Sequence, residues 1–206
     1  MKSRLRIAGR IVLPLLAAGM VAAVPAHAQF SKGYKFLEAV KKKDGVEVEA
    51  ALNEPGSTLV NAKDVTSGET ALHIVTARRD PTWLAYLIGK GANVNAQDVR
   101  GVTPLQQAIN LGWTEGVEML VSYGADLDQS NDAGETPLIA AVHRRNIPML
   151  RALLKAGADP DRADNSGRSA RDYAELTGSS QLLATIETNA TTTGKKEKQA
   201  VYGPTM

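Results

Sequence analysis

A 33-residue period constrains the fold of this chain more than any other feature of its sequence. Glycines recur at that interval, and a hydroxyl residue stands two positions after each of them. The glycines are Gly68, Gly101, Gly134 and Gly167, and the hydroxyl residues are Thr70, Thr103, Thr136 and Ser169. A fixed period of this length is typical of a chain built from stacked copies of one small structural unit.

Each unit carries the start and stop signals of two short helices. Thr103-Pro104 places a hydroxyl N-cap before a proline at the first helical position, where the missing N–H costs nothing. Apolar residues recur at helical spacing from Leu105 and again from Val117, and Gly124 ends the second stretch. The polar residues 94–101 predict an extended turn or hairpin. Two antiparallel helices with a projecting turn cannot bury their apolar faces alone, so the units must stack.

The composition fits such a stack and excludes several other classes. Hydrophobic residues make up 43% of the 206 residues but aromatic residues only 4%, so Leu, Val, Ile and Ala must form the core. The chain has no cysteine. This excludes a disulfide scaffold, an iron–sulfur cluster and a cysteine nucleophile.

The N-terminus has the three parts of a secretory signal peptide. Four basic residues precede an uncharged run from Ile11 to Val24, and the residues Pro25-Ala26-His27-Ala28 follow it. We expect cleavage after Ala28 and export to the periplasm of a two-membrane bacterium, or secretion. An uncleaved anchor is the alternative, although the 14 apolar residues fall short of the roughly 20 that span a bilayer. We expect no integral membrane span after cleavage.

Cleavage also changes the charge of the chain. The 24 basic and 22 acidic residues give +2, and removal of four basic residues with the signal leaves −2 for the mature chain. Bulk electrostatics therefore offer no attraction to nucleic acid.

The repeating unit resembles that of the ankyrin-repeat family. Thr70-Ala71-Leu72-His73, Thr103-Pro104-Leu105-Gln106 and Thr136-Pro137-Leu138-Ile139 are successively looser copies of the family's first motif, and Val94-Asn95-Ala96 is similar to its second. The resemblance implies an all-α solenoid of helix-turn-helix units with projecting β-turn or hairpin loops.

The resemblance also implies a division of the chain. We expect a signal peptide over 1–28, an ankyrin-repeat domain over 29–187 and a disordered tail over 188–206. The domain comprises a degenerate first repeat over 30–66, repeats over 67–99, 100–132 and 133–165, and a polar C-terminal capping unit over 166–187.

The sequence offers no convincing catalytic or metal-binding group, and we expect no cofactor. His73 stands at the family's histidine position, where the resemblance implies bonds to neighbouring backbone and to the Thr70 hydroxyl. The recurring Asp64, Asp98 and Asp164 are interpreted as turn residues that bond their own backbone. Trp83, Tyr86 and Trp113 are expected to pack between units, although an exposed Trp113 would suit a partner anchor.

In the ankyrin family, the turns and the ends of the first helices line a concave face that binds other proteins. Carried over position by position, the partner-binding set is Glu69, Ala77, Arg78, Val99, Arg100, Val102, Asn110, Leu111, Asp132, Ala133, Glu135, His143, Arg144, Asn165 and Arg168. Its arginines form either a ladder that binds carboxylates or a solvated face. Arg79 and Arg145 replace the glycine retained at Gly112 and Gly178, which leaves the local turn geometry open.

These features predict a non-catalytic module in the cell envelope that binds a protein partner of unknown identity and is monomeric alone. Two alternatives stay open: an accessory, inhibitory or protective subunit of an envelope enzyme, and a secreted effector that acts on another cell. A hydrolase is a third and weaker alternative, because no nucleophile–base pair can be recognised.

Overall fold

The computed structural model describes residues 31–200, with side chains described up to residue 190. The predicted signal peptide, the first residue of the predicted first repeat and positions 201–206 of the predicted tail lie outside the described residues. The helices come in five successive pairs. They are α1 (Lys32–Lys42) with α2 (Gly45–Leu52), α3 (Ala71–Ala77) with α4 (Pro81–Gly89), α5 (Pro104–Asn110) with α6 (Thr114–Ser122), α7 (Pro137–His143) with α8 (Ile147–Ala156), and α9 (Ala170–Leu176) with α10 (Ser180–Ala200).

One 3-10 turn, η2 (Leu59–Asn61), follows α2. Within residues 31–200 there is no strand, only an isolated bridge between Lys63 and Thr70. The predicted all-α repeat solenoid is confirmed.

The hydroxyl residues of the repeat start the first helices, as the sequence predicts. Thr103 Oγ1 accepts a hydrogen bond from the backbone N–H of Gln106 at 3.3 Å, and Gln106 Oε1 accepts one from the Thr103 N–H at 3.2 Å. This reciprocal capping satisfies two donors that a helix N-terminus would leave unpaired. Thr136 and Ser169 accept in the same way from the third residue of α7 and α9.

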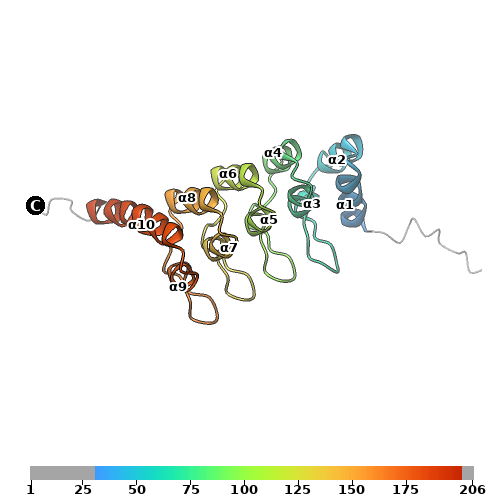
Figure 1. Ribbon diagram of the computed structural model, residues 1–206. Coiled ribbons are helices and arrows are strands. Elements are labelled where there is room, and N and C mark those ends of the chain that lie inside the picture. Colours follow the sequence, from blue (N-terminus) through green and yellow to red (C-terminus); the bar gives the residue numbers. More distant parts are fainter. Residues whose placement is uncertain (1–30, 201–206) are drawn as a thin grey trace, which may run out of the picture. The chain divides into compact units, whose positions relative to one another are not determined.

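The pairs stack into two helical layers (Figure 1). The first helices α1, α3, α5, α7 and α9 pack side by side, and α4, α6, α8 and α10 do so in the second layer. Side chains such as Leu105, Ile109, Leu120, Leu138 and Leu153 fill the space between the layers and are fully buried. The aliphatic core expected from the composition is therefore continuous from repeat to repeat.

The turn between the two helices of a pair keeps one geometry whether or not it contains glycine. Arg79 has φ 54° and Arg145 has φ 51°, close to the 68° of Gly112 and the 63° of Gly178. The arginines therefore adopt the left-handed backbone conformation that their side chains disfavour. Tertiary packing holds the turn in place against that local preference.

The last helix is longer than the sequence predicts. We expected disorder from Thr188, but α10 continues to Ala200. Leu182 and Ile186 are buried and anchor its first turns, and extension of an established helix costs far less than nucleation of a new one. Among the described residues, no helix is both long and apolar enough to cross a membrane.

Candidate protein-binding face

A side-chain oxygen fixes the shape of each projecting loop. Asp98 Oδ1 accepts hydrogen bonds from the backbone N–H groups of Arg100 at 2.8 Å and Val102 at 2.9 Å. Burial raises the pKa of Asp98, but these N–H groups and the Arg100 side chain outweigh it, so the pKa lies below its ordinary value. Asn131 and Asp164 bond their own loops in the same way. The predicted role of the recurring acidic residues as turn residues is confirmed.

Successive loops also bond to one another. A backbone N–H of each loop donates to a carbonyl of the loop before it, at 3.0 to 3.2 Å. The three bonds run from Val99 to Ser67, from Asp132 to Arg100 and from Asn165 to Ala133. The loops therefore form one row, which projects on the side of the first helices (Figure 1). We call the loops together with the C-terminal ends of the first helices the loop face.

The predicted partner-binding residues all lie at least partly at the surface. Ten are exposed: Ala77, Val99, Arg100, Asn110, Asp132, Ala133, His143, Arg144, Asn165 and Arg168. Five are half-buried: Glu69, Arg78, Val102, Leu111 and Glu135. Hydrogen bonding between loops and packing between first helices bring most of them into one row.

Arg78 has an intramolecular role that the sequence did not predict. Its Nη1 donates to the carbonyls of Val40 and Lys41 at the end of α1, and its guanidinium lies 5.7 Å from the ring centre of Trp83. Its Nη2 is 3.7 Å from a carboxylate oxygen of Asp80, and 21% of the side chain is exposed. The guanidinium thus donates to carbonyls at the C-terminus of α1, and it shares the Val40 carbonyl with the backbone N–H of Lys43.

The other arginines of the loop face are more exposed than Arg78. Arg100 keeps 76% of its side chain exposed while its Nη2 lies 3.2 Å from Asp98 Oδ2. Arg168 reaches the Ser166 hydroxyl at 3.5 Å, and Arg144 is exposed. Exposed acidic residues such as Asp132 stand between them, so the loop face carries both signs of charge.

His143 joins a polar network that spans the fourth repeat and the capping unit. Its Nδ1 is 2.9 Å from Glu135 Oε1, and its ring meets Tyr173 edge-on at 4.5 Å. The Tyr173 hydroxyl donates to Asp164 Oδ2 at 2.7 Å. Hydrogen bonds from the Ser166 and Tyr173 hydroxyls hold the pKa of Asp164 well below its usual range. Sequence analysis missed Tyr173, because nothing local marks it as the partner of a residue 30 positions away.

The two tryptophans differ in exposure. Trp113 is 7% exposed and packs against Gly116, so its suggested role as a surface anchor is wrong. Trp83 is half-buried and lines a cleft in the second layer of helices. Among the described residues, no group of three His, Cys, Asp or Glu side chains is arranged to hold a metal ion.

Comparison with known families agrees with this architecture. Residues 36–131 match the family model described as "Ankyrin repeats (3 copies)", and residues 120–174 match "Ankyrin repeats (many copies)". Proteins built from these repeats are typically non-catalytic modules for protein–protein interaction. The matched segments together run from the first described helix into α9. The chain belongs to the ankyrin-repeat family.

Proposed function

We propose that this chain is a non-catalytic module that binds another protein through its loop face. The observation that carries the proposal is the row of hydrogen bonds between successive loops. These bonds hold the loop backbones, and so the starting points of the exposed side chains, in fixed positions before a partner arrives. Binding then requires little ordering of the contact surface, which leaves more of the interaction energy for affinity.

The chemistry of the loop face suggests the contacts it makes. Val99, 61% exposed, offers an apolar contact at a loop tip beside the Arg100 guanidinium. Arg144 and Arg168 offer two further guanidinium groups, which suit carboxylates of a partner because each can donate two parallel hydrogen bonds. The acidic side chains between them favour a partner surface of mixed charge over a uniformly acidic one.

We also propose that the protein works outside the cytoplasm, in the periplasm or after secretion. The three-part N-terminal segment and the small residues that end at Ala28 support this location. Mass spectrometry of the protein recovered from the cytoplasm, the cell envelope and the medium tests it. A mature N-terminus at Gln29 is expected, and recovery of the intact chain from the cytoplasm would refute export.

Site-specific crosslinking tests the loop face. A photo-crosslinking amino acid replaces Val99 at a loop tip, and in a control it replaces Glu118, which is exposed on α6 in the second layer. We expect position 99 to capture one specific protein and position 118 not to capture it.

Charge reversal supplies a second criterion. Arg144→Glu with Arg168→Glu should abolish the adduct at position 99. The matched pair Arg151→Glu with Lys155→Glu, on exposed positions of α8, should preserve it. If both pairs of substitutions reduced the adduct at position 99 equally, or if only position 118 captured a protein, the loop face would not be the binding surface.

A further inference from the structure

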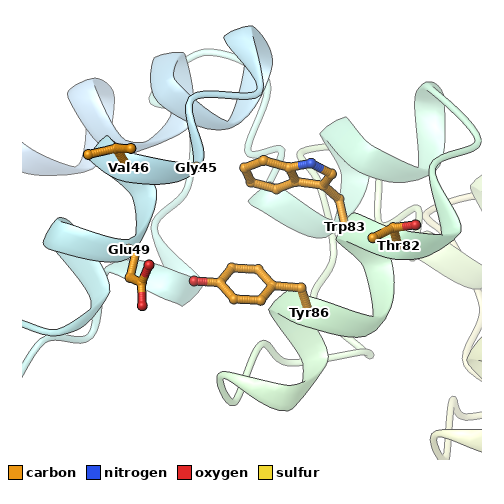
Figure 2. Close-up of a pocket in the computed structure, with 6 residues that line it drawn as sticks. All are labelled: Gly45, Val46, Glu49, Thr82, Trp83 and Tyr86. Carbon is orange, nitrogen blue, oxygen red and sulfur yellow. The ribbon is translucent and has the colours of Figure 1, made fainter.

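A cleft of about 430 Å³ opens between α2 and α4, in the second layer. Its lining consists of Gly45, Val46, Glu49, Thr82, Trp83 and Tyr86 (Figure 2). The cleft follows from the packing of the first pair. Whereas α4, α6 and α8 pack on one another in turn, α2 makes its main contacts with α1 and η2.

The α4 wall of the cleft is aromatic. The rings of Trp83 and Tyr86 meet at an interplanar angle of 72°, with their centres 6.0 Å apart, and both residues are half-buried. Val46 lies on the opposite wall and is 83% exposed, so the cleft offers apolar surface from both helices. An occupant with a long apolar stem would bury surface against both walls.

The α2 wall carries a carboxylate. Glu49 is exposed, and its carboxylate has no hydrogen bond or ion pair within residues 31–190. The Tyr86 hydroxyl points toward the α2 wall, where Glu49 lies (Figure 2). Burial raises the pKa of Tyr86, and the negative charge of Glu49 raises it further. No basic residue occurs in α2.

Three cations near the cleft have partners within the chain, and two of them lie over its aromatic rings. Lys43 Nζ lies 2.9 Å from Asp80 Oδ2. Arg78 shares that carboxylate, and its guanidinium lies 5.7 Å from the ring centre of Trp83. Lys90 Nζ lies 5.6 Å from the ring centre of Tyr86, at the C-terminal end of the same helix. None of these three residues lines the cleft. Glu49 is thus the one charged residue among the cleft-lining residues that the structure describes.

We propose that this cleft binds a lysine or arginine side chain from a basic segment of a partner protein. The aliphatic stem packs against Trp83, Tyr86 and Val46, and the cationic head reaches Glu49. Long basic side chains combine an apolar stem with a charged head, which matches the two walls. An apolar side chain would fill the same space but would leave the Glu49 carboxylate partly desolvated without a partner. The cleft therefore selects for positive charge, at a site separate from the loop face.

Nuclear magnetic resonance offers a direct test, because the two tryptophans give two indole N–H signals. The probe is a blocked pentapeptide, Gly-Gly-Lys-Gly-Gly. Its control carries norleucine, which keeps the stem of lysine without the charge. We expect the lysine peptide to shift the Trp83 signal in a saturable way. The signal of buried Trp113 should stay in place and report that the fold is intact.

Two glutamate variants on the same helix separate a specific ion pair from general attraction. Glu49→Gln should weaken binding of the lysine peptide by about five-fold or more. Glu47→Gln should change its affinity by less than about two-fold, because Glu47 is exposed on α2 but does not line the cleft. Arg144→Glu with Arg168→Glu should have no effect, so this test is independent of the loop face. An absent Trp83 shift, equal binding of the norleucine peptide, or equal loss in Glu47→Gln and Glu49→Gln would overturn the proposal.

Discussion

His73 Nε2 lies 3.0 Å from the backbone carbonyl oxygen of Val102, so a side chain of α3 ties the second repeat to the loop of the third. The Thr70 N–H donates to His73 Nδ1 at 3.2 Å, which requires that nitrogen to be unprotonated and places the proton on Nε2. Gln106 repeats the arrangement one unit later. Its Nε2 donates to the Glu135 carbonyl at 2.7 Å. A neutral donor at this position therefore links successive repeats.

Acid should weaken the His73 link. Burial lowers the pKa of His73 from its ordinary 6.5, so the folded state binds fewer protons than the unfolded state. The stabilisation is fully present above pH 6.5 and is lost as the pH falls toward the lower folded pKa, by at most about 1.4 kcal/mol per pH unit. Urea unfolding between pH 7 and pH 5 measures this loss. In His73→Gln, which copies Gln106, the decline should shrink, whereas His143→Gln should retain it. An unchanged decline in His73→Gln would contradict the assignment.

A larger residue at Gly116 should destabilise the fold, although Gly116 lies inside helix α6. Alanine at a helical glycine ordinarily stabilises by up to about 1 kcal/mol. A Cβ at Gly116, however, would lie 2.0 Å from Cε3 of Trp113. We expect Gly116→Ala to lower the free energy of unfolding by about 1 to 3 kcal/mol, because the buried indole must move. Gly89→Ala, at a helical glycine with open space around it, should be neutral or stabilising in the same assay. Equal effects of the two variants would mean that Trp113 does not pack against Gly116 in this way.

Loop stacking predicts a difference between two glycines of the repeat. Gly134 has φ 77° and Gly167 has φ 80°, so alanine at either one suffers a similar backbone penalty of about 1 kcal/mol. A Cβ at Gly134 would also lie 2.5 Å from the backbone nitrogen of Asn165 in the next loop. A Cβ at Gly167 would have no such neighbour within 4 Å. Thermal unfolding should show Gly134→Ala to be the more destabilised variant by about 1 to 3 kcal/mol. If the two melting curves coincide, the loops are not packed as closely as described.

The left-handed backbone conformation of Arg79 and Arg145 predicts an unusual stabilising substitution. Arg145→Gly should raise the free energy of unfolding by up to about 1 kcal/mol, because glycine adopts φ 51° without a steric cost. Arg79→Gly relieves the same conformation but loses the hydrogen bond from its guanidinium to the Leu111 carbonyl, worth about 1 kcal/mol. Its net effect should be close to zero. Denaturant titration of both variants checks this, and an equal gain for Arg79→Gly would show that its hydrogen bond contributes nothing.

Some features of the candidate sites could be predicted from the sequence and others could not. The loops and their row of exposed positions follow from the period, because every unit repeats the same turn residues. The cleft beside α2 left no such signal, since α2 belongs to the first repeat, whose sequence has diverged most from the period. Nothing near Glu49 in the sequence indicates that its carboxylate faces Trp83 and Tyr86 across a gap.

The sequence by itself determined the period, the helix starts at Thr103 and its equivalents, and the all-α stacked architecture. These features depend on a residue and its close neighbours along the chain, such as a hydroxyl three positions before the N–H that it accepts from. Only the tertiary structure decided the role of Arg78, the burial of Trp113 and the separation of α2 from α4. Arg78 bonds Val40, 38 positions away, because stacking of the first two pairs brings that carbonyl within reach of its guanidinium. Such contacts depend on the angle between neighbouring repeats in the stack, and a repeated local pattern does not determine that angle.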